Sequence, residues 1–319
     1  MTDDRIPVLA IVGPTGVGKT ALAVALAGEL PIEVVSADSR QVYRGMDIGT
    51  GKPTLTERRA LRHHLVDVVD PDEPYDAARF AREAAAAIVD IRGRGRFPVL
   101  VGGTGLYVRA LVRGLEPRPP ADHGLRARLR ADAGREGGAE ALHRRLAALD
   151  PETAARLHPR DLIRVTRALE VVILTGRPAV APDASWASGM SPYDLLTIGL
   201  TMGRGDLYAR LDARVDRMLA DGLLAEVDRL LTAGFGVDLP AMQGIGYRHL
   251  APVLTRGTPL AEATRTMKRD TRRYAKRQWT WFAREPGVRW ISTGAGLVDH
   301  VIVEVKKLIE LTWRFAYAE

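Results

Sequence analysis

The segment Gly13–Thr20 constrains the fold most, because its residues GPTGVGKT satisfy the pattern G-x-x-x-x-G-K-[ST] with the flanks that this pattern requires. The apolar run Val8–Val12 precedes it, and the Ala- and Leu-rich stretch ALAVALAGEL follows it. Gly13 and Gly18 allow the backbone to curl so that successive amides point inward, and a helix beginning near Lys19 adds its positive end. We therefore predict a strand, a phosphate-binding loop and a helix.

Within this loop, the Lys19 side chain is expected to reach terminal phosphate oxygens and the Thr20 hydroxyl to bind Mg²⁺. The chain contains no cysteine, which excludes disulfides, thiolate zinc sites and cysteine nucleophiles. Any metal must then be held by oxygen or imidazole ligands. This favours Mg²⁺ in a phosphate site.

A nucleoside triphosphatase needs an acid at the end of a neighbouring strand to help hold Mg²⁺. The best-placed strand, at Val99–Val101, ends in Gly102-Gly103-Thr104 without one. Asp67 and Asp70 could substitute, but they are equally well explained as turn or solvent-side residues. ATP hydrolysis is therefore weakly supported.

Further apolar runs alternate with helical stretches, which predicts right-handed crossovers and a mainly parallel sheet flanked by helices. The runs that we interpret as strands are Ile32–Ser36, Leu65–Val69, Val99–Val101 and Tyr193–Met202, the clearest helix is Ala77–Ile91, and further helices continue to Phe282. The expected fold class is α/β of the P-loop type.

The amino-acid composition changes near Glu116, where the segment EPRPPAD contains three prolines. A stretch rich in Arg, Ala and Leu follows and extends to a Pro- and Gly-rich region at 176–192. We interpret this stretch as a helical insertion. The predicted domains are a catalytic core of residues 1–116 and 198–319 and an all-helical insertion of residues 117–197.

Asp38 follows the second predicted strand, so it should lie at the carboxyl edge of the sheet beside the phosphate loop. A carboxylate there could accept a proton from a nucleophile that attacks near the phosphates. Alternatively, it caps the next helix. The turn Gly49–Pro53 is expected to bring a further cation, Lys52, to the rim of the site.

The formal net charge is +7, and it is concentrated in one segment. Residues 256–289 contain ten Lys or Arg and three acids, and the rest of the chain is balanced, with 36 of each. Clustered Lys and Arg favour a polyanion, although a solvated basic helix explains them too. At helical spacing the cations occupy one face, and the other, which should pack, carries Met267, Tyr274, Gln278, Trp281 and Phe282. Trp279, Trp281 and Phe282 could stack on bases or pack in the core.

No segment approaches the roughly 18 consecutive apolar residues of a membrane span, and Met1–Pro7 carries charged residues, so we predict a cytoplasmic protein. Nothing in the sequence requires a dimer or another obligate protein partner.

The chain resembles the tRNA dimethylallyltransferases, also called tRNA isopentenyltransferases, over nearly its whole length. The family's segments occur here in order as GPTGVGKT, DSRQVYRGMDIGTGKP, GGTGLYVRAL, HPRDLIRVTRALEV, RLDARVDRMLADGL, QGIGYRHL and AKRQWTWFAR. The resemblance implies that the exocyclic amine of the adenosine 3′ of the anticodon attacks dimethylallyl diphosphate and that diphosphate leaves.

The resemblance also implies roles for single residues. Asp38 would be the general base, and Thr15, Lys19 and Arg214 would assist catalysis by stabilising the departing diphosphate. The residues expected to bind the diphosphate are Gly13, Pro14, Thr15, Gly16, Val17, Gly18, Lys19, Thr20 and Arg214, with Mg²⁺ at Thr20 as the cofactor.

The helical insertion would grip the anticodon stem-loop of the tRNA. The residues expected to contact tRNA, from the resemblance or from the basic helix face, are Asp38, Ser39, Arg40, Gln41, Thr104, Arg164, Arg167, Gln243, Gly246, Tyr247, Arg248, Arg272, Arg273, Lys276 and Arg277.

Two positions depart from the family pattern: Ile163 stands where many members have a polar Gln, and Trp279 is bulkier than the usual aliphatic residue. Three alternative functions remain: prenylation of free adenine nucleotides, small-molecule phosphorylation by a P-loop kinase, and RNA binding without catalysis. The insertion and the basic helix favour tRNA over free nucleotides.

Overall fold

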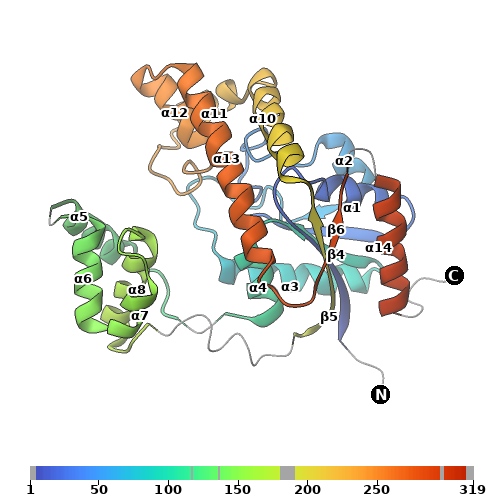
Figure 1. Ribbon diagram of the computed structural model, residues 1–319, viewed down its shortest axis with the longest axis horizontal. Helices are drawn as coiled ribbons and strands as arrows, with labels where there is room; N and C mark the ends of the chain where they lie inside the picture. Colours follow the sequence, from blue (N-terminus) through green and yellow to red (C-terminus); the bar gives the residue numbers. More distant parts are fainter. Residues whose placement is uncertain (1–4, 116–117, 136, 180–190, 295–297, 314–319) are drawn as a thin grey trace. The chain divides into compact units, whose positions relative to one another are not determined.

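The computed structural model describes residues 5–115, 118–135, 137–179, 191–294 and 298–313 (Figure 1). The chain divides into two compact units, which we describe separately. The core unit comprises Met1–Arg113 and Ser191–Glu319, and the helical unit comprises Gly114–Met190.

The core unit contains a six-stranded sheet in which all neighbouring strands are parallel, as predicted. In spatial order the strands are β3 (His63–His64), β2 (Ile32–Ala37), β4 (Phe97–Gly102), β1 (Ile6–Val12), β5 (Tyr193–Thr201) and β6 (Val288–Ser292). In β1, Leu9 and Ile11 face one hydrophobic cluster, whereas Val8, Ala10 and Val12 face another. The strand is apolar at every position because both faces of the sheet are buried.

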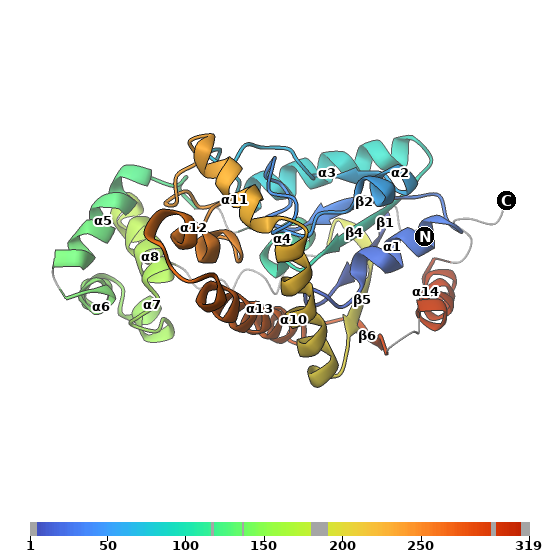
Figure 2. The same cartoon turned by 90° about the horizontal axis from the view of Figure 1, so that it is seen from above.

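Helices cover both faces of this sheet (Figures 1 and 2). Helices α1 (Lys19–Ala27) and α14 (Val298–Thr312) pack on one face, and α3 (Ala77–Gly93) and α4 (Gly105–Arg113) pack on the other. The remaining helices of the core unit are α2 (Leu55–Ala60), α10 (Arg204–Ala220), α11 (Leu223–Thr232), α12 (Tyr247–Arg256) and α13 (Leu260–Phe282). The predicted helix at Ala77–Ile91 is confirmed as α3. Its N-cap is Asp76, whose carboxylate accepts hydrogen bonds from two backbone amides.

The strand predicted at Leu65–Val69 is wrong. The third strand is the two-residue β3, and Leu65 and Asp67 both have positive φ angles, of 61° and 59°, that are incompatible with extended backbone. Val69 forms only an isolated bridge with Tyr43. Sequence analysis also missed β6, a five-residue edge strand, and α14, although Val301, Val305 and Ile309 of α14 recur at helical spacing and are buried.

The helical unit contains α5 (His123–Arg135), α6 (Ala139–Leu149), α7 (Pro151–Arg156) and α8 (Leu162–Thr175), around an apolar cluster of its own. Its buried anchor is the fully buried Glu170 of α8, which accepts hydrogen bonds from the Arg126 guanidinium at 2.9 Å and the Asp122 amide at 2.7 Å. The unit is therefore held by both an apolar core and one charged cluster.

The boundaries differ from those predicted for the insertion. The predicted end at residue 197 falls inside β5, which pairs with β1 and so belongs to the core. The predicted start, between residues 116 and 117, and part of the Pro- and Gly-rich region, 180–190, lie outside the described residues.

Candidate functional site

The loop at residues 13–20, which we call the P-loop, connects β1 to α1 at the carboxyl edge of the sheet. Gly13, Gly16 and Gly18 have positive φ angles of 135°, 79° and 107°, and Gly18 is the N-cap of α1. A Cβ on Gly13 would also lie 2.5 Å from the Leu200 carbonyl oxygen of β5. Glycine is therefore required here both for conformation and for space, as the predicted phosphate loop demands.

Lys19 folds back over the P-loop. Its ammonium group donates hydrogen bonds to the carbonyl oxygens of Gly13 at 3.0 Å and Pro14 at 2.8 Å. Burial lowers the pKa of Lys19 to about 8; the nearby Asp38 opposes this shift, and Arg214 adds to it. An anion bound on the loop would favour the charged form of this lysine.

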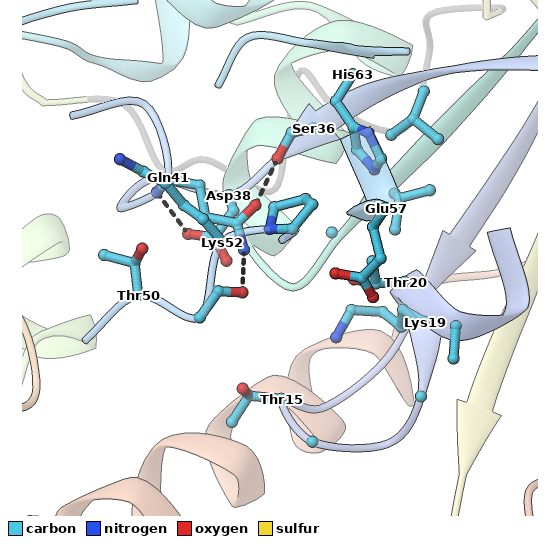
Figure 3. Close-up of a pocket in the computed structure, with 18 of the residues that line it drawn as sticks. Thr15, Lys19, Thr20, Ser36, Asp38, Gln41, Thr50, Lys52, Glu57 and His63 are labelled. Carbon is cyan, nitrogen blue, oxygen red and sulfur yellow. Dashed lines mark hydrogen bonds between the residues drawn. The ribbon is translucent and has the colours of Figure 1, made fainter. Parts of the chain in front are cut away.

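Figure 3 shows the pocket of about 270 Å³ that the P-loop lines, with Thr15, Lys19 and Thr20 on one side and Asp38 and Gln41 on the other. The remaining lining residues come from the P-loop and α1, from β2, β3 and β4, from the loop after β2, and from α2, α10 and α13. Those that carry polar or charged side chains are Ser36, Thr50, Lys52, Glu57, His63, Arg210, Arg214, Arg217 and Gln278. The structure thus brings Asp38 and the distant Arg214 into one pocket with the P-loop residues Lys19 and Thr20.

Asp38 lies directly after β2 in a run of turns. Its Oδ1 accepts hydrogen bonds from the backbone amides of Arg40 at 2.8 Å and Gln41 at 3.4 Å. No helix begins near Asp38, and the next one, α2, has Thr54 as its N-cap, so the alternative interpretation of Asp38 as a helix cap is wrong. Its Oδ2 accepts no hydrogen bond from any described residue. One carboxylate oxygen thus orients the group, and the other is open to a proton.

Arg214 enters the pocket from α10. It is partly buried, yet it forms no hydrogen bond or ion pair with any residue in the described part of the chain. Burial lowers the pKa of Arg214, and the charge of Asp38 opposes that shift. A partly buried guanidinium without a paired anion is suited to an anionic ligand.

The loop at residues 47–53, which we call the rim loop, lies against Arg214. Gly51 has φ of 58°, and any Cβ there would overlap the Arg214 guanidinium. Sequence analysis expected Lys52 to supply a cation here, and this is wrong. The Lys52 ammonium points away, donating to the Tyr43 carbonyl oxygen and the Asp47 carboxylate at 2.6 Å each, and its side chain is 2% exposed.

Asp67, which could have substituted for a strand-end acid, is also occupied. Burial would raise the pKa of Asp67, but hydrogen bonds from Lys52 and Arg58 outweigh burial and lower it. This carboxylate is therefore bound to two cations of the protein. It is not available to hold a metal.

Ser39 and Thr104 meet at the strand ends. The Ser39 amide donates to the Thr104 hydroxyl oxygen at 3.0 Å. Tyr274 of α13 lies beside them, and its pKa is raised to about 12, by burial first and then by the charge of Asp38. Sequence analysis assigned Tyr274 only to a packing face, since helical spacing does not show what that face packs against.

Gln278 of α13 was also assigned only to packing. Its Oε1 accepts a hydrogen bond from the Thr15 amide at 2.8 Å, and its Nε2 donates to the Gly103 carbonyl oxygen at 3.0 Å. Only 5% of the residue is exposed. Gln278 therefore ties the P-loop and the loop after β4 to one helix, and the segment AKRQ was the available indication of its importance.

Several residues predicted to contact tRNA make other contacts. The Tyr247 side chain is 1% exposed and its hydroxyl donates to Glu226 at 2.6 Å, so this side chain is not accessible at the surface. Gly246 is buried beside it. The Gln41 side chain accepts a hydrogen bond from the Ser36 hydroxyl at Oε1 and donates one from Nε2 to the Gly51 carbonyl oxygen, although Gln41 still lines the pocket.

Other predicted tRNA contacts lie on the surface but are paired within the protein. The Arg40 guanidinium donates to the Pro240 carbonyl oxygen at 2.7 Å, the Gln243 amide to that of Val237 at 2.7 Å, and the Arg248 guanidinium to Asp270 at 2.8 Å. In the helical unit, Arg167 pairs with Glu170, whereas the Arg164 side chain is 70% exposed. Arg164 is therefore the more accessible of the two.

Helix α13 has one buried face and one basic face, as predicted. Met267, Ala275 and Phe282 are buried in the core. On the basic face, however, Arg272 pairs with both carboxylate oxygens of Asp212 on α10 at 2.6 Å, so its guanidinium already has a partner, and its contact with tRNA stays a prediction. Arg273, Lys276 and Arg277 are exposed, and Lys276 has no ion pair among the described residues.

The two departures from the family pattern are both surface positions. Ile163 is 77% exposed and Trp279 is 48% exposed. Trp281 instead packs under the Arg109 guanidinium, 4.6 Å from the ring centre. Neither departure alters the pocket. No helix in the described ranges is long and apolar enough to cross a bilayer.

With this geometry established, comparisons with known proteins identify the family. The sequence matches the family described as IPP transferase over residues 41–285 and the family described as isopentenyl transferase over residues 6–70. The tRNA dimethylallyltransferase 1 of Syntrophotalea carbinolica is 50% identical over 316 residues, which cover 99% of this chain and 98% of that protein. The tRNA dimethylallyltransferase of Thermomicrobium roseum is 51% identical over 288 residues, which cover 90% of this chain and 86% of that protein.

Solved structures agree. The full-length tRNA isopentenylpyrophosphate transferase from Bacillus halodurans is 43% identical, with a TM-score of 0.72 and 97% of both chains covered. A eukaryotic dimethylallyltransferase acting on tRNA is 30% identical, with a TM-score of 0.77, covering 96% of this chain and 80% of that one. The chain belongs to the IPP transferase family, whose named members here are tRNA dimethylallyltransferases.

Proposed function

We propose that this chain transfers a dimethylallyl group from dimethylallyl diphosphate to the exocyclic amine of the adenosine 3′ of the anticodon in tRNA, releasing diphosphate. A relative that is 50% identical over 99% of this chain is named tRNA dimethylallyltransferase 1. The observation that carries the proposal is Arg214, a partly buried guanidinium that has no ion pair among the described residues and lines the same pocket as the P-loop. Its position suits a leaving group with several negative charges.

The proposed reaction forms one carbon–nitrogen bond and breaks one carbon–oxygen bond. The adenosine amine attacks the allylic carbon and loses a proton to Oδ2 of Asp38. The departing diphosphate gains charge as the bond breaks, and the P-loop amides, Lys19 and Arg214 stabilise that charge. The absence of an acid in Gly102-Gly103-Thr104 is consistent with this chemistry, because no phosphoryl group is transferred.

Mg²⁺ fits the same site. The Thr20 hydroxyl lines the pocket and forms no hydrogen bond with another described residue, so its oxygen can serve as a ligand. Bound there with diphosphate oxygens, the ion would supply further positive charge to the leaving group. No group of three or more His, Asp or Glu side chains in the described residues forms a metal cage of its own.

The tRNA would be held by the exposed cations of α13 and by the helical unit. Arg273, Lys276 and Arg277 of α13 and Arg164 of α8 present accessible guanidinium or ammonium groups suited to phosphates. The adenosine must leave its stack to reach Asp38, which costs a few kcal/mol that such a docking surface would offset. The tRNA substrate also favours a cytoplasmic location.

The proposal is tested by incubating the protein with Mg²⁺ and dimethylallyl diphosphate labelled in its allyl group, and offering unmodified tRNA or AMP. Label should pass to tRNA, at the adenosine 3′ of the anticodon, and the transfer should stop when Mg²⁺ is chelated. Transfer to AMP instead would make the chain a free-nucleotide prenyltransferase. Phosphate transfer from labelled ATP in a parallel reaction would make it a kinase.

A further inference from the structure

A buried carboxylate outside the pocket holds the rim loop. Glu226 of α11 is 1% exposed. Its Oε2 accepts hydrogen bonds from the Asp47 amide at 3.0 Å and the Ile48 amide at 2.8 Å, and its Oε1 accepts from the Gly49 amide at 3.1 Å. Three consecutive amides of one loop therefore converge on one side chain.

No cation pairs with this carboxylate. Glu226 has no ion pair among the described residues, and its fourth donor is the Tyr247 hydroxyl, at 2.6 Å. Backbone and hydroxyl dipoles thus compensate the whole charge, as they do when successive amides form an anion-binding concavity. Replacing any of these donors or the acceptor leaves buried polar groups unsatisfied.

The loop that Glu226 holds forms a wall of the diphosphate pocket. Thr50, Gly51 and Pro53 of the rim loop line it. Gly49 packs on the Tyr247 ring, where a Cβ would come within 2.6 Å, and Gly51 packs on the Arg214 guanidinium. The contacts therefore run from Glu226, through three residues of backbone, to the cation proposed to stabilise the leaving group.

We infer that Glu226 is a positioning residue for the diphosphate site, acting on Arg214 through the rim loop. Arg214 has no partner of its own among the described residues to orient it, so the position of Gly51 limits where its guanidinium can lie. This inference rests on the proposed diphosphate site. It assigns to α11 and α12 a role in ligand binding, although neither helix supplies a lining residue of the pocket.

Glu226→Gln tests the inference because it keeps the shape and removes one acceptor. If the new side-chain NH2 group takes the place of Oε2, it faces two backbone N–H donors and both lose their acceptor. If it takes the place of Oε1, it faces the Gly49 N–H and the Tyr247 hydroxyl, and the hydroxyl can rotate to accept. The second arrangement leaves only one backbone N–H of the rim loop without an acceptor, so it should be preferred, and we expect the Kd for inorganic diphosphate with Mg²⁺ to rise about tenfold.

The measurement is calorimetric titration with Mg²⁺ and inorganic diphosphate in four proteins: the unaltered chain, Glu226→Gln, Arg214→Gln and the double variant. If Glu226 acts through Arg214, the second substitution adds little once the first is made. An equal tenfold loss in both backgrounds, or no loss in Glu226→Gln, would refute the inference. No binding by the unaltered chain would instead refute the diphosphate site itself.

Two further variants separate positioning from folding. Glu170→Gln also weakens a buried hydrogen-bonded carboxylate, but in the helical unit, so it should lower stability without changing the Kd for diphosphate. Tyr247→Phe removes one of the four donors to Glu226 and should raise that Kd less than Glu226→Gln does, and it takes the place of Glu226→Gln if that variant does not fold. If Tyr247→Phe binds diphosphate with the same Kd as Glu170→Gln, the hydrogen bonds to Glu226 do not affect the diphosphate site and the inference is wrong.

Discussion

The P-loop and the rim loop line the same pocket, but the P-loop takes its shape mostly from its own residues, with one amide bound by Gln278, whereas a carboxylate of a distant helix binds three consecutive amides of the rim loop. In the P-loop, glycines with positive φ and the start of α1 set the backbone. In the rim loop, the amides of residues 47–49 bind Glu226, which lies 177 to 179 residues away in the sequence. Local contacts add to this: the Thr50 hydroxyl donates to the Met46 carbonyl oxygen at 2.6 Å, and the Lys52 ammonium donates to the Tyr43 carbonyl oxygen and to Asp47.

This difference shows why one half of the site could be recognised before the other. A loop defined by local conformation leaves a pattern of consecutive residue types. A loop defined by a remote carboxylate leaves only two glycines and a glutamate in another helix, and nothing in the sequence connects them. The contribution of the two loops to catalysis can be tested by substitutions in each of them. Asp38 is a third position to test, because its charge acts on both Lys19 and Arg214.

The largest effect is expected for Asp38→Asn. The amide oxygen can still accept from the Arg40 and Gln41 amides, so both loops should keep their positions, but no proton acceptor remains. We expect kcat to fall by roughly 10²–10⁴, as when a general base is removed, with tRNA affinity nearly unchanged. Single-turnover transfer rates and a tRNA binding titration measure the two. A kcat within a few fold of normal would assign Asp38 to structure alone.

Gly51→Ala should break the rim loop's contact with Arg214. The added Cβ overlaps the guanidinium, so Arg214 must move, and the KM for dimethylallyl diphosphate should rise by about tenfold or more. Gly257→Ala is the matched control, because Gly257 has a similar φ of 67° but no atom within 4 Å of the added Cβ. The control should lose about 1 kcal/mol of stability to backbone strain with an unchanged KM. Equal KM values in the two variants would mean that Arg214 is not confined by the rim loop.

Helix α13 extends the comparison, because Gln278 anchors it to the P-loop while its basic face is exposed. The double variant Lys276→Gln and Arg277→Gln should weaken tRNA binding, and the slope of log Kd against log salt should fall by about one unit for each phosphate that the helix no longer neutralises. Arg272→Gln should leave that slope unchanged, since Arg272 already pairs with Asp212. Binding titrations across a salt series distinguish the two variants. A lower slope for Arg272→Gln would show that Arg272 contacts a tRNA phosphate.

The smallest effect concerns pH. The Lys19 pKa of about 8 lies below its ordinary value, and a bound diphosphate favours the charged amine, so binding takes up a proton above that pKa. Affinity for diphosphate should therefore fall as pH rises through about 8. Lys19→Arg keeps its charge and serves as the control, because ionisation of the ligand affects both proteins equally. Parallel pH dependences of Kd in the two proteins would show that Lys19 does not titrate there.

The general architecture followed from sequence because it depends on local and repeating features. The strands around β1, β2, β4 and β5 and the helix α3 were predicted from apolar runs and spacing. The run at Leu65–Val69 misled because it is apolar enough for a strand, but the left-handed residues Leu65 and Asp67, the latter held by Lys52 and Arg58, prevent extension. Composition cannot reveal such a long-range restraint.

The sequence by itself determined the phosphate loop, the α/β class, the family and the candidacy of Asp38, Lys19 and Arg214, because each leaves a pattern of adjacent residues. Only the tertiary structure decided that Tyr247 and Lys52 face inward, that Arg272 is paired, and that Gln278 and Glu226 hold the two loops. Those outcomes depend on which donor meets which acceptor once distant helices have packed, because a polar side chain in the interior must find a partner there.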